Sequence, residues 1–222
     1  MRKLKAIIFD MDGVLFDSER AYMDRLNRFM NQDGKQLSMD MQRKLLGSGD
    51  QEKWNVFDIM YEGRLSREQF FKRYDEYYRN EPFSYRSLLF EGVIDTISTL
   101  KKQGYRLALA SSSTLYEIHS ALEECQLTSY FTSILSGEQC VKTKPDPQIY
   151  LDTLKALDIQ TQDCIVVEDS TYGIRAAKAA GLYVVAKKED TIKVDQSEAD
   201  DIISHHHELF SIINKLERSD IQ

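Results

Sequence analysis

The sequence predicts an α/β protein with a doubly wound, mainly parallel sheet (Rossmann-like) and an inserted four-helix cap domain. Short apolar runs such as 6–9, 106–110 and 164–167 alternate with segments of helical periodicity, which is typical of parallel strands joined by right-handed helical crossovers. After the first run the pattern is helical only. We therefore expect an α/β core made of residues 1–16 and 88–222, and a helical insert over 17–87.

The first strand, Ala6 to Phe9, ends in two carboxylates one residue apart. Residues i and i+2 of an extended segment point the same way, so Asp10 and Asp12 can converge before Gly13 lets the chain bend. Two carboxylates that close repel each other, which predicts a bound metal, a shifted pKa, or both. A core strand followed by an acidic turn is the alternative.

The first two helices of the insert have clear boundaries. Apolar residues at helical spacing predict a helix from Ser18 to Met30, which Gly34 closes. Ser38 can cap a short helix that stops at Gly47.

Aromatic residues mark the third and fourth helices. Ser66 and Gln69 form a capping box that opens the fourth helix. We interpret the aromatic positions as the core of a small bundle rather than as a ligand site. They are Trp54, Phe57, Tyr61, Phe70, Tyr74, Tyr77 and Tyr78.

The α/β alternation resumes near residue 90 and continues through the second half of the chain. The expected elements are a helix ending at Gly104, a strand over 106–110, a helix from 114, a short strand near 134–135, a helix over 147–157, a strand over 164–167, a helix ending at Gly181, and strands over 183–186 and 201–203. We expect the run His205 to His207 to lie at the start of a surface helix, and we interpret it as solvated rather than metal-binding.

Composition narrows the class of protein. The 222 residues are 42% hydrophobic and 29% charged, as in ordinary globular proteins. No apolar run approaches the roughly 20 residues that span a bilayer, and no signal peptide precedes the first strand, so we expect a cytoplasmic protein without a membrane partner. The net charge of −7 argues against non-specific nucleic-acid binding. Three widely spaced cysteines indicate neither a disulfide framework nor a zinc site.

Polar residues follow other strands as well, and parallel strands bring their carboxyl ends to one edge. Ser111, Ser112 and Ser113 follow the second strand, where hydroxyls before a helix can bind phosphate or simply cap the helix. Lys144 lies in a loop stiffened by two prolines, although a loop lysine is ordinarily exposed. Glu168 and Asp169 form a second acidic pair after an apolar strand.

Together these strand ends offer carboxylates, hydroxyls and a lysine. Hard oxygen ligands suit Mg²⁺, and a cation with a lysine can offset charge on a transferring phosphoryl group. An aspartate can itself attack phosphorus and form an aspartyl phosphate.

The motifs resemble the four motifs of the haloacid dehalogenase superfamily, and the insert resembles the cap of its β-phosphoglucomutase-like phosphatase branch. The resemblance covers essentially the whole chain. The residues that carry it are Asp10-Met11-Asp12-Gly13-Val14-Leu15, Ser111, Lys144-Pro145-Asp146-Pro147, and Glu168-Asp169-Ser170 followed by Gly173-Ile174.

The resemblance implies that Asp10 is the nucleophile and a Mg²⁺ ligand. Asp12 would be the general acid and base and would bind Mg²⁺ through its backbone carbonyl. Ser111 and Lys144 would hold the transferring phosphoryl group. Lys144 is chosen over Lys142 because the family's lysine directly precedes a proline.

Of the second acidic pair, the resemblance implies that Asp169 binds the metal directly, with Glu168 beside it in the metal site. The second aspartate, Asp12, argues against dehalogenase chemistry, because those relatives lack it.

The cap carries the departures from the mutase pattern. Where the mutases have a histidine and an arginine that hold the sugar phosphate, this chain has Tyr22 and Asp50, and an acid would repel a second phosphate. This favours a phosphatase. Candidate substrate-binding residues are Ser112, Tyr22, Ser48, Asp50 and Trp54.

We therefore expect a Mg²⁺-dependent phosphatase that hydrolyses a small sugar, polyol or nucleotide phosphate through an aspartyl phosphate. The alternative is a β-phosphoglucomutase-type hexose phosphate mutase. A remote alternative is a non-catalytic, phosphate-responsive switch similar to a receiver domain, but its motif order differs and its chain is shorter. We expect a monomer or weak dimer.

Overall fold

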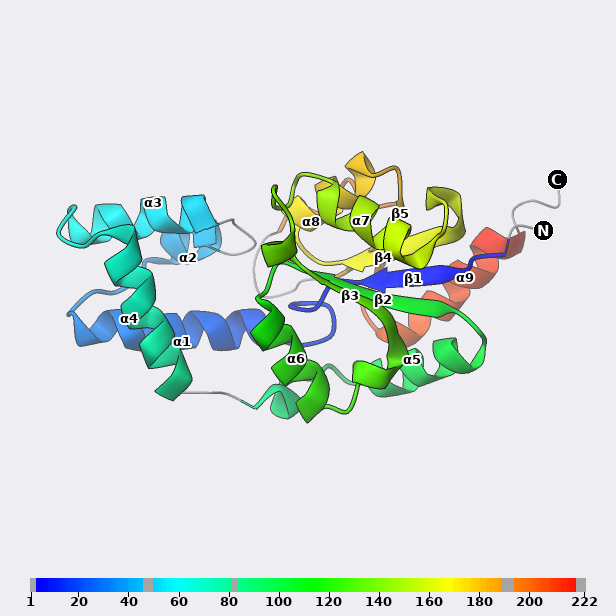
Figure 1. Ribbon diagram of the computed structural model, residues 1–222, viewed down its shortest axis with the longest axis horizontal. Helices are drawn as coiled ribbons and strands as arrows, with labels where there is room; N and C mark the ends of the chain where they lie inside the picture. Colours follow the sequence, from blue (N-terminus) through cyan, green and yellow to red (C-terminus); the bar gives the residue numbers. More distant parts are fainter. Residues whose placement is uncertain (1–2, 46–49, 81–83, 189–193, 219–222) are drawn as a thin grey trace. The chain divides into compact units, whose positions relative to one another are not determined.

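The computed structural model describes residues 3–45, 50–80, 84–188 and 194–218. The chain forms two compact units (Figure 1). The core unit consists of Met1–Asp17 and Tyr85–Gln222, and the cap unit of Ser18–Ser84. The boundaries expected from sequence, after residues 16 and 87, differ from these by one residue and by three.

Backbone pairing explains where the core unit begins and ends. The Asp17 N–H donates to the Leu88 carbonyl at 2.7 Å, and Phe16 forms an antiparallel bridge with Leu89. The 3₁₀ turn Tyr85–Ser87 precedes this pairing, and the ring of Tyr85 packs edge-on against Phe16 with centroids 5.5 Å apart. These contacts attach Tyr85–Ser87 to the core unit.

Six parallel strands form the sheet of the core unit in the order β3-β2-β1-β4-β5-β6. This confirms the predicted doubly wound α/β fold. The strands are β1 (Ala6–Phe9), β2 (Arg106–Ser111), β3 (Phe131–Ser136), β4 (Cys164–Glu168), β5 (Tyr183–Lys187) and β6 (Asp201–Ile203).

Helices cover both faces of the sheet, which explains why its central strands are mostly apolar. The four residues of β1 are fully buried. Ala6 and Ile8 pack in a cluster with residues of α7 and α8, whereas Phe9 contacts Phe131. In Figure 1, α7 and α8 lie on one side of the sheet, and α5 and α9 on the other. The helices are α5 (Val93–Lys102), α6 (Leu115–Glu124), α7 (Gln148–Leu157), α8 (Thr171–Ala179) and α9 (Leu209–Arg218).

The prediction for the histidine run was wrong for its middle residue. His205 and His207 are exposed, but His206 is only 2% exposed, and its Nε2 lies 2.7 Å from the Val14 carbonyl oxygen. The 3₁₀ turn His206–Glu208 directs this ring inward before α9 begins.

Aromatic side chains dominate the core of the cap unit. Phe70 is fully buried, stacks on Phe57 with centroids 4.2 Å apart, and meets Phe29 edge-on. The predicted capping box is present: the Ser66 N–H donates to Gln69 Oε1 at 2.9 Å, and the Gln69 N–H donates to Ser66 Oγ at 3.2 Å. The helices are α1 (Ser18–Gln32), α2 (Met39–Leu45), α3 (Asp50–Tyr61) and α4 (Arg67–Asn80).

Within the described ranges, every helix is too short or too polar to cross a membrane.

Candidate active site

The acidic residues predicted from sequence lie where the strand order reverses. From β1 the chain proceeds to β2 and β3 on one side, and then returns to β4 on the other side of β1. Such a switch point leaves a crevice beyond the carboxyl ends of the two neighbouring strands. Asp10 follows β1, while Glu168 ends β4 and Asp169 follows it.

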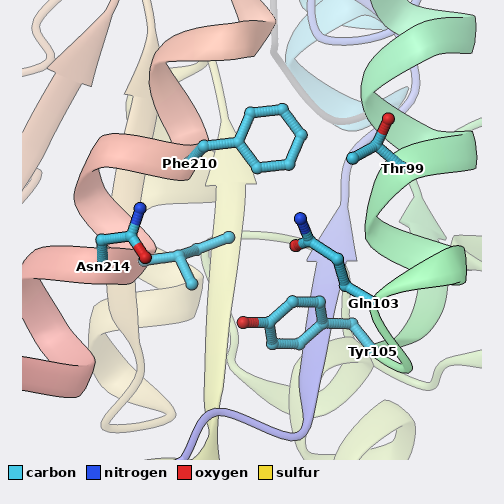
Figure 2. A pocket seen from close by; sticks show the side chains of 6 residues that line it. Thr99, Gln103, Tyr105, Phe210 and Asn214 are labelled. Carbon is cyan, nitrogen blue, oxygen red and sulfur yellow. The ribbon is translucent and has the colours of Figure 1, made fainter.

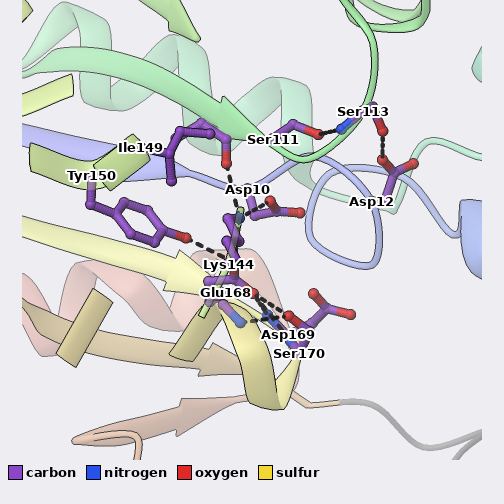
Figure 3. Close-up of polar contacts among 12 residues, drawn as sticks. Asp10, Asp12, Ser111, Ser113, Lys144, Ile149, Tyr150, Glu168, Asp169 and Ser170 are labelled. Atoms are coloured by element: carbon purple, nitrogen blue, oxygen red, sulfur yellow. Dashed lines mark hydrogen bonds and ion pairs between the residues drawn. The ribbon is translucent and has the colours of Figure 1, made fainter. Parts of the chain in front are cut away.

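Lys144 connects these two strand ends (Figure 3). Its Nζ donates to Asp10 Oδ1 at 2.6 Å, to Glu168 Oε1 at 2.7 Å and to the Ala110 carbonyl at 3.1 Å. The Lys144 side chain is 7% exposed, whereas that of Lys142 is 71% exposed and pairs with Asp146. The loop lysine that reaches the crevice is therefore Lys144.

Glu168 is completely buried, and both its oxygens accept hydrogen bonds. Besides Lys144, the Tyr150 hydroxyl donates to Oε1 at 2.8 Å. Oε2 accepts from the Asp169 N–H at 2.9 Å, and from the N–H and the hydroxyl of Ser170 at 3.1 Å each. A Cβ at Gly173 would lie 1.7 Å from Glu168 Oε1, so the first turn of α8 needs a glycine there.

Burial and neighbouring charges of opposite sign shift the pKa values of Asp10, Glu168 and Lys144 in opposite directions. Burial raises the pKa of Asp10 to about 8, opposed by Lys144 and reinforced by the charges of Glu168 and Asp12. Burial also acts against the charged forms of Glu168 and Lys144. It is outweighed at Lys144 by the charges of Asp10 and Glu168, and at Glu168 by the charge of Lys144 together with hydrogen bonds. The pKa of Glu168 is therefore lowered and that of Lys144 is raised. Lys144 and Glu168 therefore stay ionised as a pair, whereas without a further cation the ionised form of Asp10 is not fully compensated and its neutral form is favoured near pH 7.

Asp12 contacts the end of the neighbouring strand β2. The Ser113 hydroxyl donates to Asp12 Oδ2 at 2.5 Å, and the Ser113 N–H donates to Ser111 Oγ at 3.0 Å. Ser111 is buried at the last position of β2, whereas Ser112 is exposed. The structure thus brings Asp12 together with the serine cluster.

Asp169 is buried against the loop that follows β1. An ideal Cβ at Gly13 would lie 2.0 Å from Asp169 Oδ2, and Gly13 also has a φ of +75°. A side chain there would therefore be strained and would collide with the carboxylate. Gln196 fixes the backbone of this turn, because its Nε2 donates to the carbonyls of Asp169 at 2.6 Å and Lys187 at 2.8 Å.

The donor set fits a divalent cation of the Mg²⁺ type. In the described part of the chain, no three His, Cys, Asp or Glu side chains lie close enough to enclose a metal. Mg²⁺ needs no such cage, because it binds one or two carboxylates and keeps waters and substrate oxygens as its other ligands. Such a cation would compensate the ionised form of Asp10, which burial disfavours, with Asp12 and Asp169 nearby as further oxygen ligands.

Of the predicted substrate residues in the cap unit, the structure describes the side chains of Tyr22 and Trp54. Tyr22 is half-buried on α1, with the Arg25 guanidinium 5.1 Å from its ring centroid. Trp54 is half-buried and packs against Phe70 and Phe71. Ser48 lies outside the described residues. The backbone of Asp50 begins α3, and its side chain is outside the description.

Three residues of the core site were missed by the sequence analysis: Ser113, Tyr150 and Gln196. Ser113 belongs to the serine cluster that the analysis noted, so its position was a usable signal. Tyr150 follows the proline-rich loop in α7, and its inward direction depends on packing. Gln196 lies after β5 in an irregular segment, and no motif identifies it.

A hollow of about 270 Å³ lies elsewhere, between α5 and α9 (Figure 2). Tyr105 in its wall directly precedes β2, which places the hollow toward the amino ends of the strands, away from the acidic crevice. Its lining residues are Thr99, Gln103, Tyr105, Phe210, Ile213 and Asn214.

Comparison with known proteins identifies the family. The model of the haloacid dehalogenase-like hydrolase family matches residues 7–187, which is most of the chain. A phosphorylated carbohydrates phosphatase of Thermotoga maritima is 36% identical over 181 residues, covering 81% of this chain and 82% of its own. The β-phosphoglucomutase of Bacillus subtilis is 27% identical over 190 residues and covers 82% of each chain.

A solved structure agrees with these sequence relatives. CbbY of Rhodobacter sphaeroides, crystallised in complex with phosphate, superposes with a TM-score of 0.77 at 25% identity, over 93% of this chain and 96% of its own. Its similarity extends over both units. The chain therefore belongs to the haloacid dehalogenase-like hydrolases and is similar to their β-phosphoglucomutase-like members.

Proposed function

We propose that this hydrolase is a Mg²⁺-dependent phosphatase that releases phosphate from a small phosphorylated carbohydrate through an aspartyl phosphate on Asp10. The observation that supports this most directly is the contact of Lys144 Nζ with Asp10 Oδ1 at 2.6 Å, at the switch point of the sheet. A carboxylate held beside a buried ammonium is suited to attack a phosphoryl group whose charge that ammonium offsets.

In the first step a carboxylate oxygen of Asp10 attacks phosphorus, and the bond from phosphorus to the leaving oxygen breaks. The carboxyl group of Asp12 gives its proton to that oxygen, so the product leaves as an alcohol. Ser111 and Lys144 donate to the oxygens of the transferring group. These donors are fixed before the reaction, because Ser111 is buried at the end of β2 and the buried Lys144 side chain is held by Asp10, Glu168 and the Ala110 carbonyl.

In the second step a water molecule attacks the aspartyl phosphate. Asp12, now ionised, takes the proton from this water as the bond from phosphorus to Asp10 breaks. Inorganic phosphate leaves, Asp10 is again a carboxylate, and Asp12 is again protonated. One residue thus serves as acid and then as base.

For the cation we propose the carboxylates of Asp10 and Asp169 and the backbone carbonyl of Asp12 as ligands. When bound, Mg²⁺ offsets charge on the phosphoryl oxygens and favours the ionised form of Asp10. We now propose a different role for Glu168, which the sequence analysis included among the ligands. Its five hydrogen bonds hold Lys144 and the turn after β4.

For the substrate, the relative from Thermotoga maritima supports a phosphorylated carbohydrate. Hydrolysis is favoured over mutase activity because Tyr22 and Asp50 stand where the mutases carry a histidine and an arginine. A screen of sugar, polyol and nucleotide phosphates with Mg²⁺, scored by phosphate release, identifies the substrate. With β-glucose 1-phosphate, Mg²⁺ and a bisphosphate primer, glucose 6-phosphate appearing faster than free phosphate would instead support the mutase.

The nucleophile is tested with Asp10→Asn. This change keeps the size of the side chain but removes the attacking oxygen, so p-nitrophenyl phosphate hydrolysis should fall by more than about a hundredfold. The thermal midpoint should stay close to that of the wild type, which excludes a folding defect. Retention of more than about a hundredth of the activity would eliminate Asp10 as nucleophile.

A further inference from the structure

We propose that Ser113 is a positioning residue that holds the carboxyl group of Asp12 in the direction needed for proton transfer. This inference rests on the proposed function, in which Asp12 is the acid and base. Ser113 itself does not touch the reacting atoms in this scheme. It acts through Asp12.

The contact joins two strand ends that are remote in sequence. Ser113 lies after β2, and its hydroxyl donates to Asp12 Oδ2, in the loop after β1, at 2.5 Å (Figure 3). When Asp12 is ionised, this is a charge-assisted hydrogen bond, which is stronger than a neutral one; when Asp12 is protonated, Oδ2 can still accept the bond. The bond restrains the rotation of the carboxyl group.

The backbone of Ser113 is fixed from both sides. Its N–H donates to Ser111 Oγ at 3.0 Å, and its carbonyl accepts from Ser136 Oγ at 2.6 Å. Ser136 is fully buried at the end of β3 and is held by a capping box with Gln139. The backbone of Ser113 is therefore held by the ends of both β2 and β3, which limits the positions that its hydroxyl can take.

The backbone of Asp12 is also fixed, by a different set of bonds. Asp12 forms a bridge with Phe16, and the N–H of Gly13 donates to the Phe16 carbonyl at 2.8 Å. These contacts hold the main chain of the loop but not the end of the side chain. The hydroxyl of Ser113 restrains that end.

The direction of the Asp12 carboxyl group should affect only those steps in which Asp12 gives or takes a proton. During attack by Asp10, the bond to the leaving oxygen breaks as Asp12 protonates that oxygen. A p-nitrophenolate leaves readily without a proton, whereas an unsubstituted phenolate leaves poorly and depends on the acid. The decrease in rate caused by losing the Ser113 hydroxyl should therefore be larger for a leaving group that needs the proton.

The test measures kcat/KM of Ser113→Ala with Mg²⁺ on phenyl phosphate and p-nitrophenyl phosphate, which share nearly the same shape. We expect a fall of about ten- to a hundredfold on phenyl phosphate and of less than about threefold on p-nitrophenyl phosphate. Ser113→Thr restores a hydroxyl and should recover most of the lost activity. Ser120→Ala, a serine on α6, is the matched control and should resemble the wild type.

Asp12→Ala separates failure of this inference from failure of the proposed function. If Asp12→Ala shows the same dependence on leaving group with a larger loss, Asp12 is the acid, and the result for Ser113→Ala decides the inference. Equal losses of Ser113→Ala on both substrates, or no loss on either, would overturn the positioning role. If Asp12→Ala itself lacks the dependence, the assignment of Asp12 in the proposed function is wrong, and the inference falls with it.

Discussion

At the scale of one residue, Lys144 is a charged group whose burial in the candidate site costs free energy of folding. A buried ammonium loses its hydration, and two carboxylates must compensate for that loss. Glu168 serves this purpose without facing the reaction, because its remaining hydrogen bonds go to Tyr150, Asp169 and Ser170. The second carboxylate, Asp10, is the nucleophile in the proposed mechanism.

Tyr150→Phe tests whether this support is structural. The variant keeps the ring beside Lys144 and removes the hydroxyl that donates to Glu168. Since a buried hydrogen bond to a charged group is lost, we expect the free energy of unfolding to fall by about 1.5–3 kcal/mol, measured by urea denaturation. The value of kcat/KM should fall less than about tenfold, because both ion pairs of Lys144 remain.

Tyr105→Phe is the matched control for this prediction. The Tyr105 hydroxyl donates to Glu217 Oε1 at 3.2 Å, at the opposite end of the sheet and in a partly buried place. Its removal should cost about 0.5–1.5 kcal/mol. Equal stability losses for the two variants would contradict a special role of Tyr150.

Residues that sequence could reveal differ physically from those it could not. Asp10 and Asp169 could be found because an apolar strand that ends in acids is a local pattern. Ser113 and His206 could not be assigned, because the partner of each is a loop about a hundred or more residues away in sequence. The direction of such a side chain is known only once the strand order is known.

Among the elements, the cap unit depends on aromatic packing and on well-made helix ends. Helix α4 contributes Phe70, which contacts rings from α1 and α3. The capping box at Ser66 satisfies backbone donors at the start of this helix. The beginning of α4 should therefore be a sensitive point of the cap unit.

Ser66→Ala should destabilise the cap unit by about 1 kcal/mol, because the N–H of Gln69 loses its acceptor. The chain has a single tryptophan, Trp54, which packs on Phe70 and Phe71, so its fluorescence during urea denaturation reports on this unit. Lys72→Ala, exposed on the same helix, should leave the midpoint nearly unchanged. An unchanged midpoint for Ser66→Ala would show that packing alone fixes α4.

The type of most elements was predictable, but their arrangement was not. The strands β1, β2, β4, β5 and β6 were expected within one residue of their observed bounds, because each contains a short apolar run near turn signals. Which strands become neighbours depends on packing of the crossover helices, and no local pattern encodes it. Helix α9 was expected only as a surface helix start, and its extent came from the structure.

At the scale of the whole molecule, His206 connects the last part of the core unit to its first loop. Burial lowers the pKa of His206 to about 4, and the positive charge of Lys187 contributes to the shift. The neutral ring donates to the Val14 carbonyl, two residues after Asp12. Folding therefore excludes a proton that the unfolded chain would bind.

This predicts a specific dependence of stability on pH. The unfolded histidine takes up its proton near pH 6.5 but the folded one only near pH 4, so stability should be full above 6.5 and should decrease as the pH falls toward 4. Between pH 7 and pH 5 the loss from this residue is roughly 2 kcal/mol. His206→Gln should show a correspondingly smaller loss in urea denaturation followed by circular dichroism. His205→Gln, an exposed neighbour, should behave as the wild type, and an identical pH response of the two variants would refute the prediction.

The backbone pairing at the two ends of the insert has a consequence for how such proteins diversify. Because Asp17 donates to Leu88 and Phe90 donates to Leu15, the chain leaves the core unit and returns to it at adjacent points. A helical module can therefore be exchanged there for another of different length at little cost in loop closure. The core unit, with the strand ends that carry the candidate site, can thus stay the same while the inserted module is replaced.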